Sequence, residues 1–196
     1  SSIIRMLEKE AASDPEPSET LMQSLEGLRA VEKRNTGLIA FINTYRDLTR
    51  IPKPVFAEVP VSEVLAGVSV IMQAEMEHQG IAFHITDESR GLIFHADAKL
   101  IEQVLINLLR NAARAVKGVR NGKIELRAYT DSFLTPHISV TDNGCGIPED
   151  ELDKVFIPFF TTSEDGSGIG LSLSRQIMRL HKGSISVRSE EGKGST

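Results

Sequence analysis

The stretch DNGCGIP, from Asp142 to Pro148, places one carboxylate before two glycines at the end of an apolar run. The residues before it, HISVT from His137 to Thr141, alternate as a half-buried strand does. Asp142 then stands where the strand leaves its sheet, at a position that can face a cleft, and the glycines give a mobile loop. On these residues alone, a strand that ends in an ordinary Asp-Asn-Gly turn is the better interpretation. The other motifs decide between a residue that faces a cleft and a residue of an ordinary turn.

The composition is that of an ordinary soluble protein. The 196 residues are 40% hydrophobic and 25% charged, which allows one or two domains with a packed core. The formal net charge of -5, without a long basic run, argues against nucleic-acid binding. Cys145 is the only cysteine, so no internal disulfide forms, as suits a reducing compartment. No apolar run reaches the roughly 18 to 20 residues of a membrane span, and no signal peptide is recognisable.

The N-terminal part predicts two helices joined by a proline-rich hinge. Proline ends a helix, so SDPEPS, from Ser13 to Ser18, separates the first helix from a second that begins near Ser18 or Glu19. Two antiparallel apolar seams are buried best as a four-helix bundle made by two chains, although a hairpin packed on its own domain stays open. The first seam is Ile3, Ile4, Leu7 and Ala11; the second, with a spacing near 3.5 residues interrupted at Glu32 and Asn35, is Leu21, Leu25, Leu28, Val31, Leu38, Ile42, Tyr45 and Leu48.

The sequence IPKP, from Ile51 to Pro54, ends the second helix and marks a domain boundary. We expect a helical hairpin over residues 1–51, a linker over 52–55 and an α/β domain over 56–196, so the fold class is α+β. The expected strands of the second domain are Phe56 to Val59, Ile81 to Thr86, Leu92 to His95, Lys123 to Thr130, His137 to Thr141 and Ser184 to Ser189, with no apolar strand after GKGST at 192–196. The expected helices are Ser62 to His78, one capped by Asp97 with an apolar stripe from Ile101 to Val116, and Leu171 to His181.

Three polar residues share one flank of the helix that Asp97 begins. At about 100° per residue, Asn107, Asn111 and Arg114 fall within about 60° of one another, beside the buried face. A partner is expected, because an unpaired asparagine there is costly. Amide oxygens suit Mg²⁺ and an arginine neutralises phosphate, but bridges to a neighbouring loop explain these side chains equally well.

Two further motifs lie between Phe156 and Gly170. The glycines of GSGIG, 166–170, come directly before a helix, where backbone N–H groups can approach an anion. Their GxGxG spacing after a loop does not fit a dinucleotide-binding fingerprint, and no Lys-Ser or Lys-Thr pair completes a P-loop. In FIPFFTTS, from Phe156 to Ser163, three phenylalanines in a loop suggest the anchors of a movable lid, although a short core segment is an alternative.

Five motifs follow one another along the chain: Asn-x-x-x-Asn on a helix, DxGxGIP, PFFTT, GxGxGLxL and a closing GxGST. In this order they resemble the catalytic domain of sensor histidine kinases of two-component systems. In that family they are the N, G1, F, G2 and G3 boxes of the Bergerat ATP-binding fold. The resemblance covers roughly Phe56 to Thr196, and FINTYRDLTRIPKP is similar to the end of the family's dimerisation domain. The nearest likeness is to the nitrogen-regulation type.

The resemblance implies a two-layer α/β sandwich that binds ATP and Mg²⁺. By this resemblance, Asp142 accepts a hydrogen bond from the exocyclic amine of adenine and Asn111 binds the metal. Asn107 and Arg114 contact the phosphates, and the glycines of the GSGIG motif close over them. The implied nucleotide contacts are Asn107, Asn111, Arg114, Asp142, Gly144, Gly146, Ile147, Phe159, Thr161, Thr162, Gly166, Ser167, Gly168, Ile169, Gly170, Leu171 and Thr196.

The resemblance also implies an ATP-dependent protein histidine kinase that forms a homodimer through its N-terminal helices and passes phosphoryl groups to a response regulator aspartate. Related ATPases have a glutamate base four residues before the metal asparagine, where this chain has Asn107, so transfer to an imidazole is favoured over hydrolysis. The implied location is cytoplasmic, without membrane contact by this part, in a protein that can be anchored in the inner membrane.

Three departures from the family pattern qualify these expectations. No histidine precedes His78, so we expect the chain to begin after the phosphoacceptor and to be unable to autophosphorylate alone. An ATP-binding dimerising module without autokinase activity, or a related ATPase, is therefore kept as the alternative. Ser163 replaces a lysine frequent in the family's lid, and the second domain is expected to lack its last strand.

Overall fold

The computed structural model describes residues 2–13, 18–49, 51–133, 135–163 and 166–196. It divides the chain into two compact units, Ser1–Arg50 and Ile51–Thr196. Within the described residues, no helix combines the length and apolar character that crossing a membrane requires.

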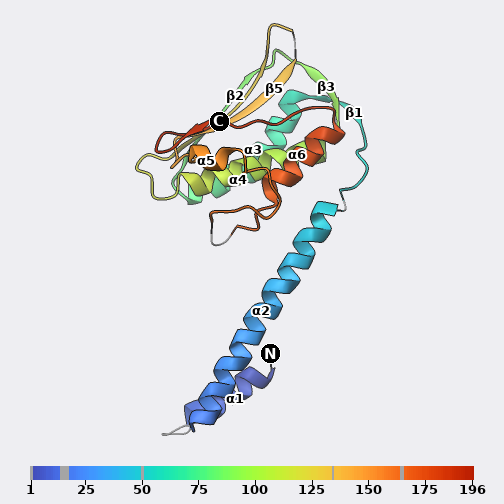
Figure 1. Cartoon of the computed structure of the whole chain (residues 1–196). Helices are drawn as coiled ribbons and strands as arrows, with labels where there is room; N and C mark the ends of the chain where they lie inside the picture. The colour runs from blue at the N-terminus through green and yellow to red at the C-terminus, as the bar shows by residue number, and fades with distance from the viewer. Residues whose placement is uncertain (1, 14–17, 50, 134, 164–165) are drawn as a thin grey trace. The chain divides into compact units, whose positions relative to one another are not determined.

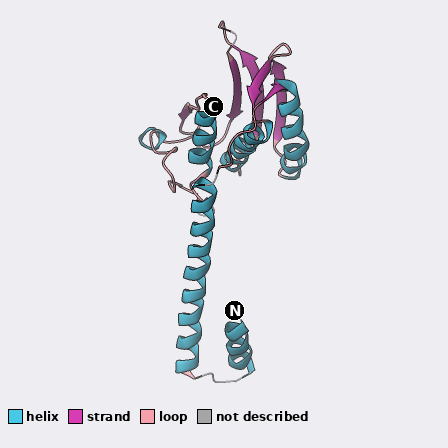
Figure 2. Ribbon diagram, turned by 90° about the vertical axis from the view of Figure 1, so that its right-hand side faces the viewer, coloured by secondary structure: helices cyan, strands magenta, loops and turns pink. Residues whose placement is uncertain are grey.

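The first unit consists of two helices, α1 (Ser2–Ser13) and α2 (Glu19–Thr49). Figure 2 shows α1 beside the first part of α2. Ile4 and Leu25 are buried, and Arg29 Nη2 lies 2.7 Å from Glu8 Oε1. The predicted helices are thus present, while most of the predicted hinge (residues 14–17) and the side chains of Ala11, Tyr45 and Leu48 lie outside the described residues.

The second unit contains a mixed five-stranded sheet in the order β2-β4-β5-β7-β6 and a separate antiparallel pair, β1 with β3. Strand β2 is parallel to β4, and the other neighbours are antiparallel. The strands are β1 (Ala57–Pro60), β2 (Ala82–Glu88), β3 (Ile93–Ala96), β4 (Lys123–Thr130), β5 (Pro136–Asp142), β6 (Ser189–Glu190) and β7 (Gly194–Ser195). The helices are α3 (Val61–His78), α4 (Ala98–Ala115), α5 (Glu149–Leu152) and α6 (Gly170–Leu180).

The helices pack on one side of the sheet (Figure 1). Alternate residues of β4 explain this layer, because Ile124, Leu126 and Ala128 are buried in the core shared with α3 and α4. A second, smaller cluster joins α4 to α6 through Leu100, Val104 and Ile177. The α+β sandwich with a helical N-terminus confirms the predicted fold class.

The C-terminal strands differ from the prediction. The expected strand Ser184 to Ser189 reduces to β6, and residues 194–195, to which no strand was assigned, form β7 against Asp142 and β6. Residues 185, 187 and 189 do show the alternating burial of a strand. A strand also needs a backbone partner, which 194–196 supply only around Arg188 and Ser189. The short helix α5 was missed as well.

Candidate functional site

The carboxylate of Asp142 is buried at the end of β5. The residue is 9% exposed, and its Oδ1 accepts a hydrogen bond of 2.8 Å from the Gly144 N–H. Burial raises the pKa of Asp142 above its usual value, although the N–H groups of Gly144 and Ser195 lower it in part. In the described part of the chain no cation pairs with this carboxylate, so it remains an acceptor for a neutral donor.

The glycines after Asp142 let the loop pass against the backbone of its neighbours. A Cβ on Gly144 would lie 2.6 Å from the Ala115 carbonyl at the end of α4, where the Cys145 N–H also donates to that oxygen at 3.0 Å. Gly146 has a φ of 69°, and a Cβ there would overlap the Glu190 carbonyl oxygen. Only glycine fits both positions, and the loop is fixed between α4 and β6.

The polar flank of α4 divides into two contacts. Arg114 Nη1 donates to Asn111 Oδ1 at 2.9 Å, so the structure brings this predicted pair together. Asn107, one turn earlier, instead donates from Nδ2 to Ser174 Oγ of α6 at 3.0 Å. Ser174 is 1% exposed and was not recognised from the sequence, because one serine on an amphipathic helix gives no signal of its own.

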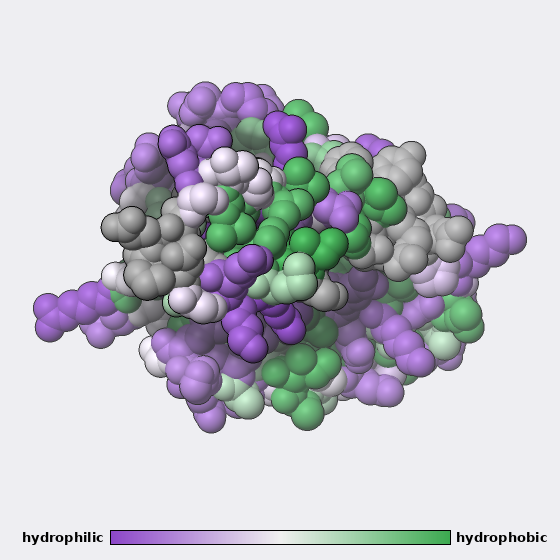
Figure 3. All heavy atoms as spheres, turned by 90° about the horizontal axis from the view of Figure 1, so that it is seen from below, coloured by the Kyte–Doolittle hydropathy of each residue, from purple (hydrophilic) through white to green (hydrophobic). Residues whose placement is uncertain are grey.

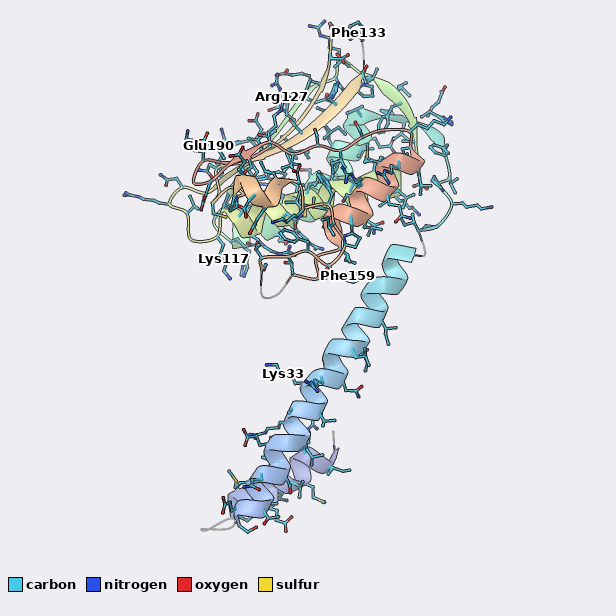
Figure 4. All side chains as sticks on the ribbon, viewed as in Figure 1. Lys33, Lys117, Arg127, Phe133, Phe159 and Glu190 are labelled. Atoms are coloured by element: carbon cyan, nitrogen blue, oxygen red, sulfur yellow. The ribbon has the colours of Figure 1, made fainter. Side chains whose placement is uncertain are left out.

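A backbone hydrogen bond joins the predicted lid to the glycine motif that follows it. The Phe159 N–H donates to the Gly168 carbonyl at 2.8 Å, and both residues have positive φ, 67° and 68°. Within it, Thr161 Oγ1 donates to the Ser163 carbonyl at 3.2 Å, while the guanidinium of Arg175 lies 4.5 Å from the Phe156 ring centroid. Phe159 is 39% exposed, on the segment between α5 and α6 (Figure 4), so it is not a core residue.

The N-terminus of α6 is open to a ligand. The helix begins at Gly170 without a side-chain cap, and no acceptor among the described residues bonds to the N–H groups of 170–172. Gly170, with Ser167 and Ile169 before it, lines a cavity region between α4 and α6, whose volume is about 400 Å³. The cavity is lined by Lys99, Glu102, Gln103, Ile106, Asn107, Arg110, Arg114, Ser167, Ile169, Gly170, Leu173, Ser174 and Ile177. Asp142 and Asn111 are not among these lining residues.

The remaining predicted residues lie near the end of β5. Thr196 Oγ1 is 3.2 Å from Thr141 Oγ1, and the Ile147 N–H donates to Ser189 Oγ at 2.8 Å. Ser189, another residue that the sequence did not indicate, also lies 2.9 Å from Ser195 Oγ, and so ties the loop after Asp142 to β6 and β7. Thr162 is exposed.

A metal site built by the protein alone is not found among the described residues, where no three histidine, cysteine or acidic side chains come together. The amide oxygens of α4 remain as ligands. Mg²⁺ is commonly held by one or two protein oxygens together with substrate phosphates, so the donor set fits a metal that arrives with a nucleotide.

Comparison with known proteins identifies the second unit. A sequence profile of the histidine kinase-, DNA gyrase B-, and HSP90-like ATPase family matches residues 96–196. The signal transduction histidine-protein kinase AtoS of Escherichia coli K12 is 31% identical over 188 residues, which are 96% of this chain and 29% of AtoS. The chain therefore spans less than a third of this relative's length.

Solved structures agree in sequence and fold. The catalytic domain of histidine kinase ThkA has a TM-score of 0.64 and 34% identity, over 72% of this chain and 91% of that domain. ThkA in complex with the response regulator protein TrrA has a TM-score of 0.69 and 26% identity, over 99% of this chain and 55% of ThkA. With these matches and the buried Asp142, the chain belongs to the histidine kinase-, DNA gyrase B-, and HSP90-like ATPase family, among its sensor histidine kinases.

Proposed function

We propose that this chain is the ATP-binding and dimerising core of a sensor histidine kinase, which supplies phosphoryl groups first to a histidine and then to a response regulator aspartate. The observation that carries the proposal is the buried Asp142 carboxylate at the end of β5, which accepts from backbone N–H groups and has no cationic partner among the described residues. Such a group accepts a hydrogen bond from the exocyclic amine of adenine, whereas guanine offers an acceptor there and is repelled. This explains a choice of ATP over GTP.

The phosphates would lie between α4 and α6. The free N–H groups at the start of α6 and the guanidinium of Arg114 supply positive charge, and Gly166, Ser167 and Gly168 let the backbone approach closely. Asn111 would contribute its amide oxygen to Mg²⁺, which neutralises charge on phosphate oxygens when bound. The residues of this chain would thus position the nucleotide. The proposed transfer needs no side chain that takes a proton, which agrees with Asn107, because an amide cannot act as a base.

The phosphoacceptor is the part of the proposal that this chain does not supply in a recognisable form. All five histidines lie at or after His78. Several have structural contacts: His181 Nε2 accepts from the Asp97 N–H at 3.0 Å, and His137 Nε2 lies 3.3 Å from Asp131 Oδ2. We therefore assign the acceptor to a segment outside residues 1–196 of the full-length protein, by analogy with the kinases that this chain resembles.

A labelled-ATP assay on the full-length protein tests the kinase activity. The proposal expects label on a histidine upstream of Ser1, in a form labile to acid and stable to base, which the same protein with Asp142→Asn acquires far more slowly. A protein that binds ATP but acquires no label would instead be an ATP-binding module without autokinase activity. Steady phosphate release by residues 1–196 alone would indicate a related ATPase and contradict the argument from Asn107.

A further inference from the structure

Ser174 carries one of only three buried polar side chains among the residues for which burial is described; the others are Ser89 and Asp142. Its hydroxyl accepts the hydrogen bond from Asn107 Nδ2, which links α6 to α4 across the inner end of the cavity. A buried hydroxyl is costly unless it is bonded, so this contact accounts for the serine on an otherwise apolar face. Its effect is exerted on the amide of Asn107.

Gly170 confines the same amide from the other side. Gly170 and Ser174 are one helical turn apart and share a face of α6. A Cβ on Gly170 would overlap Asn107 Oδ1 and would lie 2.9 Å from its Cγ and 3.0 Å from its Nδ2. The amide therefore lies against α6, with its oxygen beside the first turn and its nitrogen beside Ser174.

The orientation of the amide follows from the electrostatics of α6. A serine hydroxyl can accept or donate, so Ser174 alone would tolerate either orientation. The N–H groups of the first turn of α6 bond to no acceptor in the described part of the chain, and together with the positive end of the helix dipole they favour an oxygen beside Gly170 over an NH₂ group. With Nδ2 bonded to Ser174, the amide presents an acceptor to the cavity.

We propose that Ser174 is a positioning residue for nucleotide binding, because it holds the Asn107 amide with its oxygen turned toward the cavity. An oxygen in that place serves an electropositive group, namely the metal ion of a Mg–nucleotide or one of its water ligands, and not a phosphate oxygen. The proposal rests on the ATP-binding function above and adds the residue that orients one of its ligands.

Nucleotide titrations with and without Mg²⁺ separate this role from a general structural one. Ser174→Ala should weaken ATP binding in Mg²⁺ roughly three- to tenfold, as expected for one hydrogen bond, and leave binding in excess EDTA unchanged. Asn107→Ala should show the same selective loss, and the double variant should lose no more than Asn107→Ala alone. Ser89→Ala is the matched control, because Ser89 is also buried, and its hydroxyl donates to Asp87 Oδ1 at 2.5 Å and does not contact Asn107.

Two further measurements keep the proposal testable if one variant is poorly folded. Gly170→Ala adds a methyl group that displaces the same amide, so it should also reduce the Mg²⁺-dependent part of binding. In NMR spectra without nucleotide, the Asn107 side-chain amide signals, assigned by their loss in Asn107→Ala, should shift in Ser174→Ala and not in Ser89→Ala. Unshifted signals, or unchanged Mg–ATP affinity in folded Ser174→Ala, would overturn the proposal. A wild-type chain that binds no ATP would instead contradict the proposed function, whatever the NMR result.

Discussion

At the scale of single residues, Asp142 combines burial with a carboxylate that has no ionic partner among the residues that the structure describes. Burial of this carboxylate costs solvation free energy. Two backbone N–H groups bond to the charged form and offset that cost only in part. A residue that served only the turn after β5 could be exposed, as Asn143 is while its Oδ1 accepts from the Lys123 N–H at 2.7 Å. We therefore attribute the burial of Asp142 to the proposed nucleotide binding rather than to the turn.

The raised pKa of Asp142 predicts that ATP binding depends on pH. As the pH falls, this carboxyl gains its proton at a higher pH than an ordinary aspartate, and the neutral acid is a weaker acceptor for the proposed adenine amine. ATP affinity should thus fall on mild acidification, followed by calorimetric titration over a pH series. Asp142→Asn should bind roughly tenfold to a hundredfold more weakly at neutral pH and lack this dependence. The control is Asp150→Asn, because the Asp150 side chain is 81% exposed, and this variant should bind ATP as the wild type does. If Asp142→Asn showed the wild-type pH profile, the assignment of Asp142 to the adenine amine would be refuted.

At the scale of elements, the loop after β5 and the end of α4 are in direct backbone contact. Gly144→Ala should therefore separate the two elements, because its Cβ would meet the Ala115 carbonyl at 2.6 Å and a backbone group cannot rotate away. We expect the loss of most ATP binding together with a lower melting temperature, measured by calorimetry. Gly27→Ala, where a Cβ meets nothing within 4 Å, should leave the melting of the second unit unchanged. Normal ATP binding by Gly144→Ala would show that the loop does not need this contact.

The cap of α4 gives a second prediction at this scale. Asp97 Oδ1 accepts from the Leu100 N–H at 3.2 Å and Oδ2 from the Val55 N–H at 2.9 Å, and these backbone bonds, Val55 first, lower the pKa of Asp97. Asp97→Ala should reduce the free energy of unfolding by about 1 kcal/mol. Because the folded-state pKa is lowered, this stabilisation is present above the unfolded-state pKa and is lost as the pH falls through the folded one. Denaturant unfolding at neutral and acidic pH checks both statements, with Asp97→Asn as the variant that keeps the cap.

How far the sequence predicts these elements depends on how local their signals are. Helix α4 could be predicted because Asp97 and the apolar stripe lie within one continuous segment. Helix α5 has a proline and three acidic residues at its start, but four residues are too few to show periodicity. The bond of Asn107 to Ser174 joins residues 67 apart, and the pairing of β7 with Asp142 joins residues 53 apart. Neither partner carries a pattern of its own, so only the folded chain reveals them.

At the scale of the whole molecule, the segment after the domain boundary is attached to both helices that border the cavity. The Phe56 ring stacks on His95 with a centroid distance of 5.3 Å and meets His181, just after α6, edge-on at 5.1 Å. Ile51 packs against the cluster of Leu100, Val104 and Ile177. A displacement of this segment would therefore move α4 and α6 together, which would give the linker a physical route to the proposed nucleotide site.

The first unit leaves apolar side chains of α2 uncovered. Contacts with α1 involve Ile4, Leu25 and the pair Glu8–Arg29, whereas Val31, Leu38 and Ile42 are 63%, 56% and 54% exposed. Figure 3 shows hydrophobic residues at the surface among hydrophilic ones on the face that it draws. Exposed residues at helical spacing over several turns are most simply buried by a second copy of the same helix, in agreement with the predicted dimer.

Sedimentation equilibrium should accordingly give residues 1–196 a mass near twice the 21.5 kDa of one chain. The double variant Leu38→Glu/Ile42→Glu should return it to one chain, because carboxylates buried in an apolar seam repel and are desolvated. Val70→Glu, on an 81% exposed residue of α3, is the matched control and should leave the dimer intact. ATP affinity should be the same in all three proteins, because the proposed nucleotide contacts lie within the second unit. A double variant that stays dimeric would place the interface elsewhere, and a monomeric wild type would refute dimerisation through α2.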